Sequence, residues 1–203
     1  NQGLSVALAS GVEHLKDRFD YIVRSDADDI SRPERIALQI AFMEANPTVG
    51  VASGHVSIFV GEPRAVIGRR AIPAGTDLSA FAMSRTPINH SCSIFRSSAL
   101  RDASYPSTRA PFEDWWICLR LLAAGWKIGS IDRVLMDFRG GAAMLMRRSG
   151  REYAKAERQF LRQVYSEGIM PRTAYFKNLA IRGVMRLLPS TLLNAAYAMK
   201  MHR

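Results

Sequence analysis

Apolar and polar residues alternate along the chain with two different periods, which predict its helices and strands. Apolar residues recur at helical spacing over residues 4–16, 36–45 and 112–123, so three amphipathic helices are expected there. Short β-branched or apolar runs at residues 21–23, 49–60, 90–96 and 127–139 predict buried strands. Strands and helices that alternate in this order are typical of an α/β protein with a largely parallel sheet.

The helix after residue 31 carries the clearest start signal. Ser31 and Glu34 have the S-x-x-E spacing of a capping box, and Ile36, Ile40 and Met43 share one helical face. We therefore expect this helix to begin near Ser31 and to bury those three apolar side chains. The glycine- and proline-rich segment 61–80 is typical of a loop.

Composition is that of an ordinary folded protein of 203 residues, with 48% hydrophobic and 23% charged residues. The two cysteines, Cys92 and Cys118, provide neither a disulfide framework nor the spacing of a metal site, which favours a reducing compartment. No uninterrupted apolar run reaches the roughly 18 residues that a membrane helix requires.

Positive charge is concentrated at one end of the chain. Residues 139–203 hold 13 Lys and Arg and 3 Glu, whereas residues 1–138 are balanced. We predict an α/β domain over residues 1–140 and a basic helical extension over residues 141–203. Basic residues interleaved with apolar ones indicate an anionic partner, either lipid head groups or nucleic acid, although a solvated helical face has the same pattern. The basic cluster consists of Arg147, Arg148, Arg151, Lys155, Arg158 and Arg162.

Three carboxylates, Asp26, Asp28 and Asp29, follow the predicted strand "YIV". A calcium loop of the EF-hand type is excluded because its fifth position would be Ile30 and its sixth, normally glycine, would be Ser31. A phosphatase of the haloacid dehalogenase type fits poorly, since polar residues separate the strand from the first aspartate. Two interpretations stay open: a site for Mg²⁺ or Mn²⁺ bound to a nucleotide diphosphate, and an acidic turn that caps a helix.

A second acidic pair, Glu113 and Asp114, opens the helix in "FEDWWICLRL". Acids in a first helical turn are favoured by the helix dipole, so this pair has a purely structural explanation. The functional alternative is a general base beside aromatic side chains. His90 and Cys92 are spaced to share one side of a strand, as a thiol nucleophile and its base would be. No orienting acid is evident, however, and Cys92 is predicted to be a small core residue.

Taken in order, four blocks carry a family resemblance: "NQGLSVALASG", "YIVRSDADDISRPERIALQIAFMEANPTVGVASG", "PINHSCSIFRSSAL" and "FEDWWICLRLLAAGWKIGSIDRVLMDFR". Over residues 1 to about 140 the chain resembles the family 2 glycosyltransferases of bacterial polysaccharide and glycan assembly. The resemblance implies a GT-A fold with a mostly parallel sheet flanked by helices. It also implies an inverting displacement of a nucleotide diphosphate from a sugar donor.

By position, the resemblance assigns roles to the acids. It implies Asp28 and Asp26 as ligands of a divalent cation, Mg²⁺ or Mn²⁺, and Asp26 also as a contact of the nucleotide ribose. It implies that Asp29 helps to bind donor or acceptor, and it places His90 beside the acceptor. The general base for the acceptor hydroxyl is expected at Asp114, with Glu113 as the alternative.

The implied partners are a nucleotide-sugar donor and a glycan or lipid-linked acceptor. The basic extension predicts a peripheral contact with an anionic membrane, so we expect a cytoplasmic protein at the inner face of the cell membrane. Nucleic acid is the weaker expectation because no groove-reading motif or stacking module is visible.

Two departures from the family pattern stand out. The family opens with strands that bind the nucleotide base, and none precedes Asn1, so we expect a truncated catalytic domain. The family often has Asn where this chain has Ala9. A non-catalytic module that binds a membrane surface is therefore the alternative function.

Overall fold

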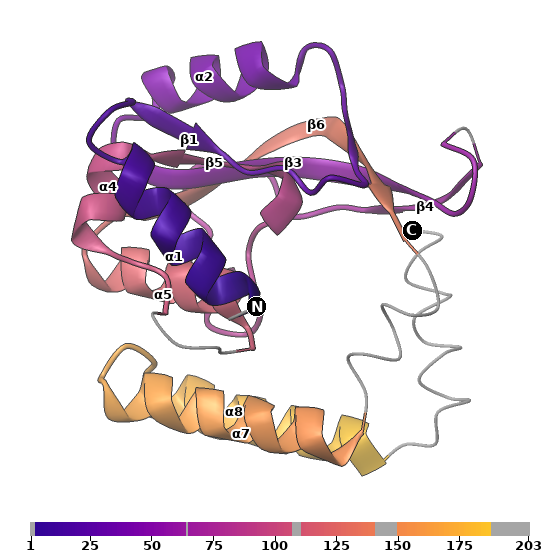
Figure 1. Cartoon of the computed structure of the whole chain (residues 1–203). Helices are drawn as coiled ribbons and strands as arrows, with labels where there is room; N and C mark the ends of the chain where they lie inside the picture. Colours follow the sequence, from indigo (N-terminus) through magenta and orange to yellow (C-terminus); the bar gives the residue numbers. More distant parts are fainter. Residues whose placement is uncertain (1–2, 64, 107–110, 141–149, 188–203) are drawn as a thin grey trace.

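A six-stranded mixed sheet forms the centre of the molecule (Figure 1). The structure is a computed structural model that describes residues 3–63, 65–106, 111–140 and 150–187. Along the sheet the strands are β1 (Tyr21–Val23), β5 (Ser93–Arg96), β3 (Val49–Phe59), β6 (Lys127–Arg139) and β2 (Ile30–Ser31), with β4 (Val66–Arg70) also paired to β3.

The strand directions correct one expectation. β3 and β6 pair in parallel, but β5 pairs antiparallel with both β1 and β3, β2 with β6, and β4 with β3. The prediction of an α/β sheet is confirmed, whereas the expectation of a mostly parallel one is wrong. A hairpin links β3 to β4 within the segment 61–80 expected to be loop, and hairpins join antiparallel strands.

Helices cover both faces of the sheet. In Figure 1, α2 lies on one face, while α1, α4 and α5 lie on the other and the hairpin of α7 and α8 packs beyond them. The helices are α1 (Leu4–Leu15), α2 (Arg35–Ala45), α3 (Ser79–Ala82), the 3₁₀ helix η1 (His90–Cys92), α4 (Ser97–Asp102), α5 (Glu113–Ala123), α7 (Arg151–Ser166) and α8 (Arg172–Leu187). None of the helices in these ranges is long and apolar enough to cross a membrane.

The larger hydrophobic core lies between the sheet and the helices on the side away from α2, namely α1, α4, α5 and α7. Trp115 and Leu119 of α5 belong to the same buried cluster as Phe160 and Leu161 of α7. The first helix of the basic extension is therefore packed into the core that supports α5. A smaller cluster beneath α2 contains Met43, Val49, Ala52 and Ile94.

Helix α2 differs from its prediction at both its start and its buried face. It begins at Arg35, and Ser31 lies in β2 instead of capping the helix. Ile36 and Ile40 are 43% and 39% exposed, so of the predicted apolar face only Met43 is buried. The remaining buried positions are polar: Arg35 and Gln39 face the sheet because they hydrogen-bond to backbone carbonyls there.

Candidate active site

The acid cluster lies in the loop that follows β1. The Arg24 N–H donates to the Ser93 carbonyl, 3.0 Å away, so the loop leaves the sheet beside the start of β5. The Asp29 N–H donates to the Asp26 carbonyl at 3.2 Å, which closes a turn around Asp28. The prediction that the three carboxylates sit at the carboxyl end of a strand is confirmed.

A buried arginine fixes this loop in place. Arg35 is 1% exposed, and its guanidinium donates to the carbonyls of Arg24 (2.6 Å) and Ser91 (3.2 Å). It also donates to the Ser31 hydroxyl at 2.9 Å. Buried carbonyls need such donors, and here one side chain ties the acid loop, β2 and η1 together. Sequence patterns missed Arg35 because its helix was expected to bury only apolar residues.

Asp26 and Asp28 have contrasting surroundings. Asp26 accepts a 2.6 Å charge-assisted hydrogen bond from Arg24, whose side chain is only 11% exposed. Asp28 is exposed, and its carboxylate has no hydrogen bond or ion pair with any described residue. Of the two acids expected to hold a cation, Asp28 is thus the one whose two carboxylate oxygens both lack a partner among the described residues, whereas Asp26 has one oxygen paired with Arg24.

Asp29 is partly buried. Its Oδ1 accepts a hydrogen bond from the Arg139 N–H at 2.9 Å, which anchors the loop to the end of β6. Its Oδ2 is buried without a hydrogen-bond partner among the described residues. Burial raises the pKa of Asp29, and the negative charges of Asp26 and Asp28 raise it further. The Ser91 hydroxyl and the Arg139 amide lower this pKa, but they only partly offset the increase.

The second acidic pair begins α5 and contacts His90. Glu113 Oε1 lies 3.7 Å from His90 Nδ1, and His90 Nε2 shares a 2.7 Å hydrogen bond with the Tyr105 hydroxyl. Burial raises the pKa of Glu113, but His90, the first-turn backbone and the charge of Arg24 together outweigh it, so the pKa lies below its ordinary value. Tyr105 was not singled out from sequence, because it lies in a segment without periodic pattern.

The two acidic sites are electrostatically connected through Arg24. The same guanidinium pairs with Asp26 and lowers the pKa of Glu113, although these acids are far apart in the sequence. The structure therefore brings together the loop after β1, η1 and the start of α5. His90, which was placed beside the acceptor by resemblance, belongs to this group.

Phe112 holds the start of α5 in an unusual conformation. It adopts φ 67°, in the left-handed region that bulky residues rarely occupy. Its ring packs against Tyr153 and Phe160 of α7, with centroids 5.1 and 5.2 Å apart. This contact anchors the residue directly before Glu113. Asp114 accepts a 2.8 Å hydrogen bond from the Trp115 N–H and has no cationic partner among the described residues.

The acidic residues of this site suit a cation that takes part of its ligands from a bound substrate better than a metal site formed by protein side chains alone. Across the described ranges, no three His, Cys, Asp or Glu side chains are arranged to hold a metal ion by themselves. The free carboxylate of Asp28 and the orphaned Oδ2 of Asp29 are nevertheless hard oxygen donors of the kind that Mg²⁺ and Mn²⁺ prefer. Such ions commonly take their other ligands from substrate phosphates and water.

The thiol nucleophile considered from sequence has no support. Cys92 and Cys118 are both fully buried, and burial raises the pKa of each thiol. A reactive cysteine requires the opposite shift. Cys92 is a core residue, as predicted.

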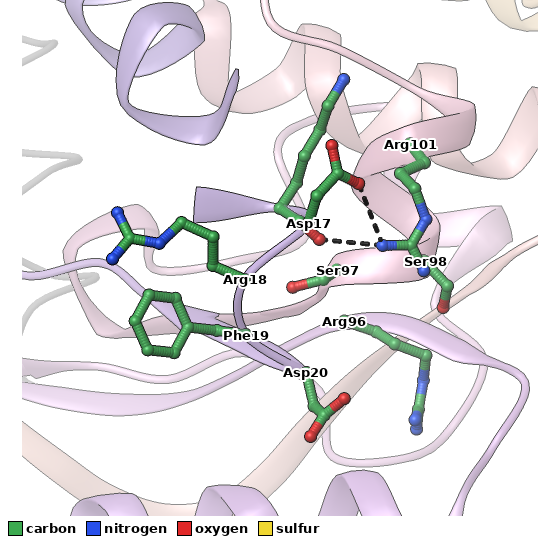
Figure 2. A pocket seen from close by; sticks show the side chains of 9 residues that line it. Asp17, Arg18, Phe19, Asp20, Arg96, Ser97, Ser98 and Arg101 are labelled. Carbon is green, nitrogen blue, oxygen red and sulfur yellow. Dashed lines mark hydrogen bonds and ion pairs between the residues drawn. The ribbon is translucent and has the colours of Figure 1, made fainter. Parts of the chain in front are cut away.

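A separate hollow of about 270 Å³ lies at the other end of β1 (Figure 2). It is lined by residues 16–20, which precede the strand, and by residues 96–98 and 101, from the end of β5 and from α4. Arg101 donates to the Lys16 carbonyl at 2.8 Å and pairs with Asp17 at 3.5 Å. Arg96 donates to the Met43 carbonyl at 2.7 Å. Because these guanidinium groups are engaged within the chain, we do not assign the hollow a ligand.

Comparison with known proteins gives a consistent result. Residues 1–103 match the family model described as glycosyl transferase family 2. The amylovoran biosynthesis glycosyltransferase AmsE of Erwinia amylovora is 32% identical over 200 residues, covering 97% of this chain and 73% of that protein. A UDP-Gal:alpha-D-GlcNAc-diphosphoundecaprenol beta-1,3-galactosyltransferase of Escherichia coli is 28% identical, covering 94% of this chain and 69% of that protein.

A solved structure shares the fold. The mannosyltransferase PcManGT of Pyrobaculum calidifontis, solved in complex with GDP-Man and Mn²⁺, superposes with a TM-score of 0.57 at 18% identity. The match covers all of this chain but only 61% of that transferase. The predicted GT-A fold is confirmed. On the family match and the 32% identity to AmsE, the chain belongs to glycosyl transferase family 2.

Proposed function

We propose that the protein is an inverting, metal-assisted glycosyltransferase that moves a sugar from a nucleotide-diphosphate donor to a hydroxyl of a glycan or lipid-linked acceptor. The observation that carries this proposal is the proximity of two acidic sites: Arg35 ties the loop after β1 to η1, and His90 of η1 lies 3.7 Å from Glu113. One site offers oxygens to a cation, and the other offers a base. A displacement at a sugar carbon needs both stabilisation of the departing diphosphate and removal of the acceptor proton.

The loop after β1 is the proposed donor site. Asp28 and Asp26 would hold the Mg²⁺ or Mn²⁺, with Asp26 also in reach of the nucleotide. Asp29 would help to bind the donor or the acceptor. The bound cation would offset negative charge on the departing diphosphate, which is Lewis-acid assistance. Arg35 keeps the loop in position, because it donates to the Arg24 carbonyl within it.

The start of α5 is the proposed site of the base. Asp114 is favoured because it has no cationic partner among the described residues, whereas Glu113 lies beside His90. The acceptor oxygen would attack the anomeric carbon as its proton passes to the Asp114 carboxylate. The bond from that carbon to the diphosphate oxygen breaks, and its electron pair leaves with the diphosphate. Attack opposite to the leaving group inverts the anomeric configuration.

His90 is proposed as a positioning residue. Its hydrogen bond to Tyr105 and its contact with Glu113 orient the imidazole beside the start of α5, where the acceptor is proposed to bind. The resulting chain from Tyr105 to Glu113 holds the first turn of α5 in place. His90 thus supports the base without itself taking the proton.

The acceptor and the cellular location are part of the same proposal. The E. coli relative is named for a lipid-linked acceptor, a GlcNAc diphosphoundecaprenol. We propose an acceptor of this chemical class, and a cytoplasmic enzyme held at the inner face of the membrane by its basic helices. Without a spanning helix in the described ranges, the contact made by this part of the chain would be peripheral.

The direct test is the stereochemistry of transfer. The protein would be incubated with α-linked UDP- and GDP-sugars, Mn²⁺ and a short-chain GlcNAc-diphospho-lipid, and the product examined by NMR. A β-linked product, abolished by Asp114→Asn and by chelation, is expected. An α-linked product would exclude inversion.

The binding-module alternative predicts a different result. Association with vesicles without release of nucleotide from any donor would favour that alternative. Asp20→Asn is the matched control for Asp114→Asn and Asp26→Asn, because Asp20 is an exposed aspartate at the opposite end of β1 from the acid loop. Release of phosphate from p-nitrophenyl phosphate, lost in Asp26→Asn, would instead favour a phosphatase.

A further inference from the structure

A stripe of four cations runs along the outside of α7. Arg151, Lys155, Arg158 and Arg162 are all exposed, and their spacing of four, three and four residues places them on one helical face. We call these four residues the basic stripe. They extend over three helical turns, so they form a linear array of charge.

The basic stripe does not contribute to the core. The buried side of α7 is formed by Glu157, Phe160, Leu161 and Val164, which lie on a different face from the stripe. None of the four stripe residues has an ion pair with a described residue. Unpaired like charges along one face repel each other, so packing alone gives no reason for this arrangement.

Nearby acids are already neutralised. Residues 151–187 contain three glutamates. The buried Glu157 pairs with Arg182 of α8, and Glu167 pairs with Arg120 of α5 at 3.2 Å. Glu152 is therefore the remaining acid on these helices that could offset the four cations of the stripe, so this face of α7 keeps a net positive charge.

Aromatic side chains lie between the two helices and on the outside of α8. Tyr165 of α7 stacks on Tyr175 of α8 with ring centroids 4.5 Å apart and planes 9° apart, which holds the hairpin together. Tyr165 remains 36% exposed. Phe176 is 52% exposed, and the Arg172 guanidinium lies 5.7 Å from its ring centroid. Exposed aromatics beside cations are the composition of helices that lie in a membrane interface.

We propose that the α7–α8 hairpin docks on an anionic lipid bilayer, with the basic stripe facing the head groups and Phe176 entering the interface. Charge complementarity selects an anionic surface. The exposed Phe176 favours lipid over nucleic acid, because an apolar ring gains free energy in the interface. This surface deepens the proposed membrane location, but it requires no sugar transfer.

Docking through this hairpin would place α7 between the bilayer and the start of α5, because the stripe and Phe160 lie on opposite faces of α7. The same helix α7 packs through Tyr153 and Phe160 on Phe112, the residue directly before Glu113. In Figure 1 the hairpin lies beyond α5, on the side away from α2. The first turn of α5 would then lie about one helix diameter, roughly 10 Å, from the bilayer, a distance that a projecting head group has to span. This arrangement suits an acceptor whose sugar is carried on a lipid diphosphate.

The test is flotation with vesicles of phosphatidylcholine alone and of phosphatidylcholine with about one third phosphatidylglycerol. The double variant Arg158→Glu/Arg162→Glu is compared with Arg18→Glu/Arg133→Glu, which makes the same charge change at exposed sites outside the hairpin. We expect wild-type protein and the control to float only with anionic vesicles, and the stripe variant to partition at least about 20-fold more weakly. Phe176→Ser is expected to weaken partition several-fold at unchanged charge.

Equal loss of flotation in both double variants, or no flotation of the wild type, would overturn the proposal. Tighter binding of the wild type to a single-stranded oligonucleotide than to anionic vesicles would also overturn it and favour nucleic acid. Nucleotide release from the donor, measured without vesicles, tests the proposed sugar transfer independently of membrane docking. It is expected to be unchanged in the stripe variant, whose far-UV circular dichroism confirms folding.

Discussion

Both ends of β1 are rich in charged residues, yet the two ends differ in how those charges are satisfied. At the end where β1 begins, Arg96 donates to the Met43 carbonyl, and Arg101 donates to the Lys16 carbonyl and pairs with Asp17 (Figure 2 shows the contacts of Arg101), so these charges hold the fold together. After the strand, the Asp28 carboxylate has no described partner and Asp29 keeps a buried oxygen unsatisfied. Unsatisfied polar groups cost stability, so an end that retains them is the better candidate for function.

The largest effect is expected at the proposed base. Asp114→Asn should lower kcat for sugar transfer by about 10²–10⁴, because a general base contributes roughly that factor. Glu113→Gln should lose less, since Glu113 lies beside His90 and is not the proposed proton acceptor. Steady-state kinetics on both variants make the comparison. If Glu113→Gln is the more damaging change, the assignment of the base is reversed.

The next largest effect concerns the arginines at the two ends of β1. Arg35→Leu should lower the free energy of unfolding by about 3 kcal/mol, because several buried carbonyls lose their donor. Arg101→Leu, at the exposed hollow, should cost less than about 1 kcal/mol. Urea denaturation measures both. Similar losses at the two sites would show that Arg35 has no special role in the acid loop.

A smaller effect is expected at Phe112, which supports the start of α5. Phe112→Ala removes the ring contacts with Tyr153 and Phe160 and should destabilise the protein by about 2 kcal/mol, less than a fully buried phenylalanine. Phe112→Gly relieves the left-handed backbone while removing the same contacts, so it should be the more stable of the two. Thermal unfolding ranks them. A less stable glycine variant would contradict the backbone argument.

The smallest effect is a pH-dependent gain in stability. Because the folded-state pKa of Asp29 is raised, ionisation penalises the folded state, and stability falls as pH rises from the ordinary value of 3.8 through the folded pKa. Asp29→Asn should therefore be more stable at neutral pH by less than about 1 kcal/mol, with the difference disappearing in acid. Donor binding should weaken in the same variant. A stability difference that grows in acid would contradict the shift.

Much of this arrangement could be predicted from sequence, because the relevant signals are local. The short apolar run before Asp26 predicted a strand, and the apolar spacing after Glu113 and Asp114 predicted a helix that these acids open. Strand β1 and helix α5 lie where these patterns predicted them. The antiparallel direction of β5 was missed because only the short helices α3 and η1 lie between β4 and β5, without a long helix of the kind that connects parallel strands. The chain of contacts from Tyr105 to Glu113 depends on tertiary packing alone.

Helix α2 shows why a periodic pattern can mislead. Ile36 and Ile40 suggested an apolar face, but the sheet beneath presents backbone carbonyls that need donors. Arg35, Gln39 and Met43 recur every four residues, which was the signal for the correct face. Arg24 gives a related lesson: the polar residue that interrupts the strand pattern is the positive partner of Asp26.

The central claim is that the loop after β1 holds a cation together with a nucleotide diphosphate. Isothermal titration of UDP and GDP into the protein, with and without Mn²⁺, tests it most directly. We expect tighter binding of at least one nucleotide with Mn²⁺, an enhancement lost in Asp28→Asn and retained in the matched Asp20→Asn. Binding that is indifferent to Mn²⁺, or an enhancement that survives Asp28→Asn, would contradict the account.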